Sequence, residues 1–400
     1  MKVLLAHPGT QYSFQLARQL YKKNSLYEFH TGVAFGKDSW VYKLCSKLPA
    51  KIYRKISNRF IDEVPDKFLK RKFFIELKAL ILIKSGFEEE NVLYWRNKQF
   101  QRAIATSSIL ASELIIGFDT SSWILAKRCK QYNKKFILDI SIGHPLSKEK
   151  IYAKLSEIYP EWREQTVPKK KIFIDLECQE MELADTVIVP SEFVKQTLVE
   201  NGVTVKKIIV NPFGTLVEEF RYDAGIKSIK NKISFLFLGT FLARKGLPLL
   251  LEAWKEMNPP NAKLIIAGYG KIPGAISLPE NVENRGIIAK DERQNLFDSA
   301  HVFLFPSYFE GLAQVQIEAM ACGLPVVGTI NSGAYELVED SVDGFIIEAG
   351  NKEQLKKSIA FFLSSPEKIE IMGKAARKKS ELFSWDNYGE RWENIINSIL

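Results

Sequence analysis

The sequence predicts an α/β protein with two doubly wound domains, each built on a parallel β-sheet with helices on both faces. Short apolar runs alternate with helical patterns along nearly all of the 400 residues, as is typical of parallel sheets. The alternation breaks once, over the polar residues 211–231, which include Pro212, Gly214 and Gly225. Roughly 200 residues lie on each side of this break, enough for one doubly wound domain apiece.

The first half contains four apolar runs of strand length separated by helical patterns. The first run ends in the turn His7-Pro8-Gly9. The strands are expected at residues 2–6, 113–118, 135–140 and 185–189. The helices are expected at residues 12–23, 121–132, 148–162, 169–184 and 191–201. We assign residues 1–205 to an N-terminal domain.

The second half repeats the same rhythm, and we assign residues 206–384 to a C-terminal domain. Its strands are expected at residues 233–238, 262–267, 281–286, 301–305, 325–328 and 344–348. Its helices are expected at residues 247–257, 291–300 and 314–322, followed by helices to the C-terminus.

Composition excludes several classes of protein. Hydrophobic residues make up 46% and charged residues 26%, which are globular values and argue against a disordered or fibrous chain. The four cysteines, Cys45, Cys129, Cys178 and Cys322, form no CxxC pair and read as reduced thiols in a cytosolic protein. The N-terminus does not read as a signal peptide, and no uncharged apolar stretch approaches the ~18 residues of a membrane span.

The positive charge is concentrated in one segment. The chain carries a formal net charge of +9, and residues 43–84 hold twelve Lys and Arg against four Asp and Glu, a net charge of +8. An excess of this kind indicates an anionic partner such as a nucleotide, a nucleic acid or a lipid headgroup.

The segment from Phe305 to Pro325 contains the most informative motif. A strand ends at Phe305, a loop carries Glu310 and Gly311, and a helix follows with Glu318 on it. Ligands of open α/β sheets bind beyond the carboxyl ends of the strands, where a helix N-terminus favours phosphate. Two carboxylates eight residues apart could therefore flank one ligand from different heights.

This segment resembles the family 4 (group 1) retaining glycosyltransferases of the GT-B fold, in which two Rossmann-like domains face a central cleft. The resemblance rests on motifs that follow in order along the chain. They are Pro306-Ser307, Glu310-Gly311, Glu318-Ala319-Met320-Ala321, Gly323, Pro325-Val326, Gly333, Glu336 and Asp343-Gly344-Phe345. The resemblance also implies that a C-terminal helix, residues 385–400, returns to the N-terminal domain.

The resemblance assigns roles to the motif residues. It implies that Glu310 contacts the donor sugar near the reacting carbon and that Glu318 holds the ribose hydroxyls. The backbone of Gly311, Leu312 and Ala313 would hold the diphosphate or the sugar. Ala313 departs from the family, because a Gly or Pro is common there, and Ala300-His301 replaces the usual Ala-Asp.

A second motif, Arg244-Lys245-Gly246, follows a glycine-bearing strand end and precedes a helix. Because the sequence contains no Asp-x-Asp, we expect these two cations to compensate a donor diphosphate without a metal or other cofactor. The family commonly has Arg directly after the glycine, where this chain has Thr240; Arg244 is then expected to supply that charge.

Three further sites follow from the resemblance. His144, in the loop after residues 135–140, is expected to contact the donor sugar and to share catalysis with Glu310. Ile287 and Ile288 resemble the stretch whose backbone meets the nucleotide base. Gly9 and Thr10 belong to the first strand's loop, which borders the acceptor and the diphosphate.

The basic segment 43–84 has several readings. It is a solvated pair of basic helices, an attachment site for an anionic membrane surface, or a surface for an anionic acceptor such as a lipid diphosphate. Aromatic residues interleave with its Lys and Arg, which suits the membrane reading. No nucleic-acid-binding module accompanies the charge, so nucleic acid is not expected as a partner.

The resemblance therefore implies a retaining, metal-independent hexosyltransferase. It would move a sugar from a nucleotide-sugar to a hydroxyl of a glycan or lipid-linked acceptor, in cell-surface polysaccharide or glycolipid biosynthesis. We expect a cytoplasmic protein that can sit on the inner face of the membrane. A non-catalytic nucleotide-sugar-binding protein and a sugar-nucleotide epimerase of the same fold remain as alternatives.

Overall fold

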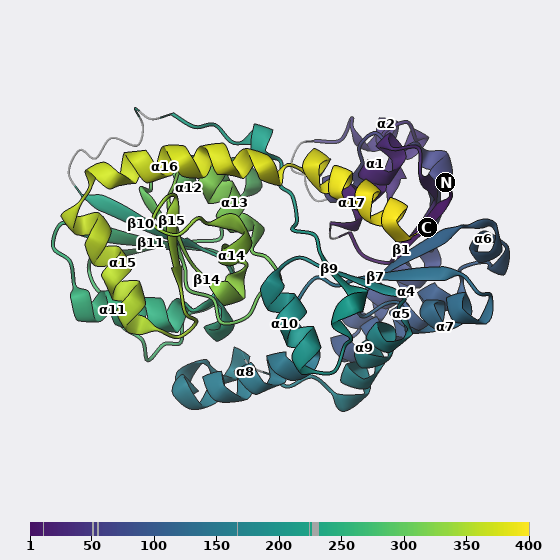
Figure 1. The fold of residues 1–400 in the computed structure, drawn as a ribbon, viewed down its shortest axis with the longest axis horizontal. Coiled ribbons are helices and arrows are strands. Elements are labelled where there is room, and N and C mark those ends of the chain that lie inside the picture. Colours follow the sequence, from purple (N-terminus) through teal and green to yellow (C-terminus); the bar gives the residue numbers. More distant parts are fainter. Residues whose placement is uncertain are drawn as a thin grey trace.

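The computed structural model describes residues 1–10, 12–49, 52–53, 56–165, 167–223, 225 and 232–399. It contains two α/β lobes that lie side by side, with the N-terminal lobe in purple and blue and the C-terminal lobe in green and yellow (Figure 1). Each lobe is built on one parallel sheet, as the sequence predicts.

The N-terminal sheet has seven strands in the order β5-β2-β1-β6-β7-β8-β9, and every pairing in it is parallel. Its strands are β1 (Val3–His7), β2 (Leu26–Thr31), β5 (Leu69–Arg71), β6 (Leu114–Phe118), β7 (Lys135–Asp139), β8 (Thr186–Val189) and β9 (Ile208–Val210). A separate parallel pair joins β3 (Phe35–Gly36) and β4 (Phe60–Ile61).

The N-terminal helices cover both faces of this sheet. They are α1 (Ser13–Lys22), α2 (Trp40–Cys45), α4 (Phe73–Lys84), α5 (Glu89–Arg102), α6 (Thr106–Ala111), α7 (Trp123–Gln131), α8 (Pro145–Ile158), α9 (Lys171–Leu183) and α10 (Glu192–Glu200). Helix α8 begins earlier than the expected residue 148, because Pro145 suits its first turn and the Nδ1 atom of His144 accepts a hydrogen bond from the Leu146 N–H.

The C-terminal sheet has six parallel strands in the order β12-β11-β10-β13-β14-β15. They are β10 (Ile233–Leu238), β11 (Ala262–Ala267), β12 (Val282–Gly286), β13 (Val302–Phe305), β14 (Val326–Thr329) and β15 (Gly344–Ile347). Its helices are α11 (Leu247–Met257), α12 (Arg293–Asp298), α13 (Gln314–Ala321), α14 (Ala334–Leu337), α15 (Lys352–Ser364) and α16 (Glu367–Ser380).

The ten strands predicted from the sequence are all present, within one residue or so at each end. The prediction missed β2, β5 and β9 of the N-terminal sheet and the short pair β3 and β4. Strand β2 carries Glu28 and His30, which pair with each other at 2.9 Å and break its apolar pattern. Strand β9 has only three residues and pairs with β8, so the N-terminal sheet extends just beyond the predicted domain boundary at residue 205.

The last helix, α17 (Trp385–Ile399), follows α16 along the top of the molecule and crosses to the N-terminal lobe (Figure 1). It packs against α1. Asp386 accepts hydrogen bonds from Gln19 and Lys22 of α1, and the Tyr388 hydroxyl donates to Asp139 at 3.5 Å. These contacts tie the end of the chain to the first lobe.

No described helix is both long enough and apolar enough to cross a membrane.

Candidate active site

A cavity of about 480 Å³ opens at the carboxyl ends of the C-terminal strands. It lies at the point where the strand order changes direction, between β10 and β13, which is where open α/β sheets bind ligands. Seven of the predicted site residues line it together: Lys245, Ile287, Ile288, Glu310, Leu312, Ala313 and Glu318.

Two glycines let the strand ends form the base of this cavity. Gly268, just after β11, has a φ of +143°, and a Cβ there would lie 1.7 Å from the carbonyl oxygen of Gly239, just after β10. Both glycines line the cavity. A side chain at residue 268 would therefore force the two strand ends apart and fill the space.

Glu310 is held by two cations. Glu310 is 8% exposed, and its Oε1 atom lies 2.6 Å from the Arg244 Nη1 and 2.5 Å from the Lys245 Nζ. Burial lowers the pKa of Lys245, and the neighbouring Glu310 opposes that effect. The Lys245 ammonium also lies over the Phe305 ring, 5.4 Å from its centroid. Two positive charges and one negative charge leave an excess positive charge beside the cavity.

Glu318 faces a cation that the sequence did not single out. The Nη1 atom of Arg293 lies 3.0 Å from both carboxylate oxygens of Glu318. Burial raises the pKa of Glu318, and Arg293 opposes that shift. No motif marked Arg293 in the sequence, because its partner lies 25 residues away on another helix.

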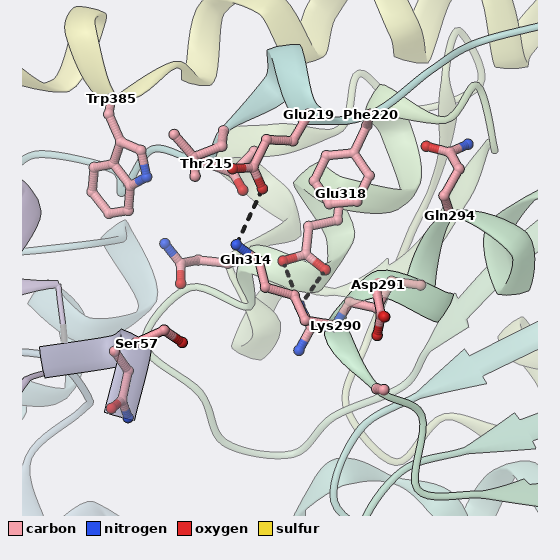
Figure 2. A pocket seen from close by; sticks show the side chains of 14 residues that line it. Ser57, Thr215, Glu219, Phe220, Lys290, Asp291, Gln294, Gln314, Glu318 and Trp385 are labelled. Carbon is pink, nitrogen blue, oxygen red and sulfur yellow. Dashed lines mark hydrogen bonds and ion pairs between the residues drawn. The ribbon is translucent and has the colours of Figure 1, made fainter. Parts of the chain in front are cut away.

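A second and larger cavity, of about 850 Å³, adjoins the first and shares Arg293, Gln314 and Glu318 with it. Figure 2 shows Glu318 and Lys290 on one side of it and Ser57 of the N-terminal lobe on the other. Trp385 of α17 and the connecting segment around Thr215 complete the wall. Residues of both lobes therefore line this cavity.

Gly311 lies where the lobes meet, and it is not among the described residues that line the 480 Å³ cavity. A Cβ at this position would lie 1.9 Å from the carbonyl oxygen of Ser141. The Ser191 hydroxyl donates a 2.6 Å hydrogen bond to the Gly311 carbonyl. Glycine is therefore required here by a close approach between the two lobes.

His144 is 2% exposed and does not line this cavity. Its Nδ1 atom caps α8, and its Nε2 atom lies 3.7 Å from the Cys178 Sγ. Burial lowers its pKa to about 4, so the ring is neutral at physiological pH. The loop it ends does reach the site, because a Cβ on Gly143 would lie 2.7 Å from the Phe309 ring. The predicted sugar contact of His144 stays a prediction.

Gly9 and Thr10 are also absent from the described lining of the 480 Å³ cavity. Their carbonyl groups accept hydrogen bonds from the Ser13 hydroxyl at the start of α1, at 3.5 and 3.2 Å. Their role beside the acceptor and the diphosphate stays a prediction. In the described part of the chain, no group of three or more His, Cys, Asp or Glu is arranged to hold a metal ion.

Two family models match parts of the chain. Residues 219–379 match the model of the glycosyl transferases group 1, and residues 157–213 match the glucosyltransferase 3-like N-terminal domain. Residues 219–379, which make up most of the C-terminal lobe, therefore resemble the group 1 glycosyl transferases. The first match contains Lys245, Glu310 and Glu318, and thus most of the cavity described above.

Curated relatives match part of the sequence of this chain. An uncharacterized glycosyltransferase of Methanocaldococcus jannaschii is 29% identical over 207 residues, which is 51% of this chain and 56% of the relative. A GDP-mannose-dependent monoacylated alpha-(1-6)-phosphatidylinositol monomannoside mannosyltransferase of Corynebacterium glutamicum is 31% identical over 170 residues, or 39% of this chain and 44% of the relative. The matches thus span about half the length of these relatives.

Solved structures resemble the whole chain. The sucrose-phosphate synthase of Thermosynechococcus elongatus gives a TM-score of 0.66 at 19% identity, covering 100% of this chain and 99% of that one. Anabaena HepE in complex with UDP-glucose gives a TM-score of 0.64 at 15% identity, with 100% of both chains covered. The fold of this chain is therefore GT-B.

The lobe interface of this GT-B protein contains a carboxyl group that predicts a pH effect. Glu336 Oε1 accepts a 2.6 Å hydrogen bond from the Glu192 N–H, while its buried Oε2 has no hydrogen-bond partner among the described residues. Burial raises the pKa of Glu336 from 4.5 to about 7. The folded state then binds more protons than the unfolded state between these values, so this group lowers stability as pH rises through that range.

We therefore expect Glu336→Gln to raise the melting temperature relative to wild type at pH 8 and to change it little at pH 4.5. Melting curves of both proteins across this range measure the difference. The Glu370→Gln variant, altered at an exposed residue of α16, serves as the control. A difference between Glu336→Gln and wild type that is constant with pH would contradict the assignment.

Proposed function

We propose that this protein moves a hexose-type sugar from a nucleotide-sugar to an acceptor hydroxyl with retention of anomeric configuration. The observation that carries the proposal is the cavity in which Glu310, held by Arg244 and Lys245, faces the same space as Glu318. The excess positive charge suits a diphosphate, and the carboxylates suit sugar and ribose hydroxyls.

The donor would occupy the 480 Å³ cavity, with its diphosphate near Lys245 and the N-terminus of α13 and its base near Ile287 and Ile288. Arg244 and Lys245 would stabilise the leaving diphosphate, so that the reaction needs no metal. The acceptor would approach from the N-terminal lobe. Closing of the lobes around the donor would exclude water and limit hydrolysis.

Relatives and neighbours support a nucleotide-sugar donor. HepE was solved in complex with UDP-glucose, and the Corynebacterium relative is named for GDP-mannose and a phosphatidylinositol mannoside. On this basis we propose a glycan or lipid-linked acceptor at the cell surface.

One experiment separates this function from its alternatives. The protein is incubated with UDP-, GDP- or ADP-hexoses and methyl glycosides in the presence of EDTA, and the products are followed by NMR. We expect release of nucleoside diphosphate and a new glycoside with the donor's anomeric configuration. An epimerised nucleotide-sugar formed without acceptor would show an epimerase. Nucleotide-sugar binding without any product would show a binding protein.

We also propose that helix α4 rests on an anionic membrane surface. Its outward face is apolar: Phe73, Phe74, Leu77, Leu80 and Ile81 are 42–82% exposed. Its inward face carries the buried Glu76 and Ala79. The described part of residues 43–84 holds the end of α2, then β4, β5 and α4, so it is not a simple pair of solvated basic helices. Its residues Lys51, Arg54 and Lys55 lie outside the described part of the chain.

The basic residues around α4 favour a bilayer over a second copy of the chain, because two such surfaces would repel each other. Near an anionic leaflet each Lys or Arg contributes about 1 kcal/mol. The triple variant Phe74→Ser, Leu77→Ser, Ile81→Ser is expected to lose co-sedimentation with vesicles of phosphatidylcholine and phosphatidylglycerol. Wild type and Leu382→Ser, altered at an exposed apolar residue of the C-terminal lobe, should retain it. Concentration-dependent self-association of wild type without vesicle binding would overturn this proposal.

A further inference from the structure

A separate cavity of about 280 Å³ lies in the N-terminal lobe. None of its lining residues belongs to the 480 Å³ cavity that we propose for the donor, called the donor cavity below. The walls of the 280 Å³ cavity come from α5, from α9 with the segment before it, and from the residues that follow β6. The volume is near the lower limit for small-molecule sites, which suits a single sugar ring.

Three aromatic rings from three different helices form one side of this cavity. The rings of Tyr94 and Trp123 are stacked, with centroids 5.8 Å apart and planes 4° apart. The Phe173 ring is tilted against Tyr94 at 5.5 Å. The apolar C–H face of a pyranose packs well on such rings, because the face of an aromatic ring carries partial negative charge.

Polar groups of both signs form the rest of the wall. Lys169 pairs with the buried Glu177, and the Arg96 Nη1 lies 3.6 Å from the Glu76 Oε1. The Arg96 Nε donates to the Asn97 Oδ1 at 3.0 Å. Because each cation has a carboxylate near it, the cavity offers donors and acceptors without a large net charge. This combination favours a neutral ligand rich in hydroxyl groups over an anion.

The backbone beside the cavity is strained. Thr120, a β-branched residue that lines it, has a φ of +66°. Its N–H donates to the Glu180 Oε2 at 2.8 Å, and its carbonyl accepts from the Asn97 Nδ2 at 2.8 Å. Such strain persists only where the surroundings impose it, and it is concentrated at ligand sites.

The position of Thr120 in the sheet is that of a ligand site. It follows β6, which lies beside β1, and β1 connects onward to β2 on its other side. The strand order therefore changes direction between β1 and β6, as it does beside the donor cavity.

Helix α8 contacts both α9, which lines this cavity, and the segment Ala243–Lys245 beside the 480 Å³ cavity. Burial lowers the pKa of Lys148 on this helix, and the charges of both Lys169 and Arg244 lower it further. Lys148 is thus in electrostatic reach of Lys169 in the N-terminal cavity and of Arg244, which contacts Glu310.

We propose that the N-terminal cavity binds one neutral glycosyl unit of the acceptor, with its ring against Tyr94, Trp123 and Phe173. This inference rests on the proposed function. It adds a subsite that recognises one sugar ring of the acceptor. The protein would then select acceptors by that ring and not by the aglycone or lipid attached to it.

The test uses the full chain and methyl glycosides of glucose, galactose, mannose and N-acetylglucosamine, with binding titrated by saturation-transfer NMR. At least one glycoside should bind wild type and Tyr94→Phe, which keeps the ring. Tyr94→Ala and Lys169→Ala should each weaken that binding, by about tenfold for the lost aromatic contact. Tyr335→Ala, altered at an exposed aromatic of the C-terminal lobe, serves as the control.

Melting temperatures with and without nucleotide-sugar show whether each variant is folded and still binds donor. The proposal is overturned if none of these glycosides binds, or if Tyr94→Ala and Lys169→Ala bind them as wild type does. A donor-induced shift that persists in that case would leave the proposed function intact. If no nucleotide-sugar raised the melting temperature of wild type, the proposed function itself would be contradicted.

Discussion

Replacing Glu310 by Gln should lower kcat for sugar transfer by about 10²–10³-fold, the usual effect of removing one group that stabilises developing charge. Glutamine keeps the shape of the side chain but removes the negative charge that we propose to lie nearest the reacting carbon. Lys245, which lines the cavity, and Arg244 beside it would then lack their counter-ion. Because both cations remain for the diphosphate, KM for the nucleotide-sugar should not rise. Steady-state release of nucleoside diphosphate measures both constants.

The matched control for Glu310→Gln is Glu370→Gln. Glu370 is an exposed residue of α16 that pairs with Lys374 at 2.6 Å. Its replacement should leave kcat and KM unchanged. If Glu310→Gln retained wild-type kcat, the assignment of Glu310 as the charge-bearing group at the sugar would be wrong.

Replacing Lys245 by Met should reduce kcat/KM by at least about 10²-fold, with effects on both kcat and KM. The ammonium lines the donor cavity beside Glu310, and methionine keeps the length of the side chain without its charge. Donor binding loses a partner for the diphosphate, and the leaving group loses stabilisation as it departs. Kinetics at several donor concentrations separates the two effects.

Lys374→Met, altered at an exposed lysine of α16, is the control for Lys245→Met. The melting temperature of Lys245→Met should not fall sharply, because Arg244 still pairs with Glu310 and burial already penalises the Lys245 charge. An unchanged kcat/KM in a folded Lys245→Met protein would contradict the proposed contact between Lys245 and the diphosphate.

The fold could be predicted from the sequence to a large extent because buried parallel strands read as continuous apolar runs. Each of the ten predicted strands is present, and the motif around Glu310 lies at a strand end beside a helix start. Lys245 and Glu310, far apart in the sequence, meet because the loops after β10 and β13 lie at the same edge of one sheet.

Other features could not be predicted because they depend on tertiary packing. Arg293 reaches Glu318 only because α12 packs beside α13, and the sequence does not show this packing. The sequence showed aromatic residues among the Lys and Arg of residues 43–84, but the exposure of the apolar side chains of α4 and the burial of Glu76 depend on how this helix packs. The sequence did not indicate that the His144 ring caps α8, and the expected contact of His144 with the donor sugar stays a prediction.

The N-terminal cavity had no sequence signature either. Tyr94, Trp123 and Phe173 lie on three helices, and each alone reads as an ordinary packing residue. Their convergence beside the strained Thr120 is a property of the folded lobe.

Donor binding tests the central claim most directly, and a thermal shift measures it on the intact chain. One nucleotide-sugar among the UDP-, GDP- and ADP-hexoses, at about 100 times its Kd, should stabilise wild type by roughly 2.7 kcal/mol. Glu318→Ala should reduce that shift, and Glu370→Ala should not. If none of these nucleotide-sugars shifts the melting curve of wild type, the cavity around Glu310 and Glu318 is not a donor site.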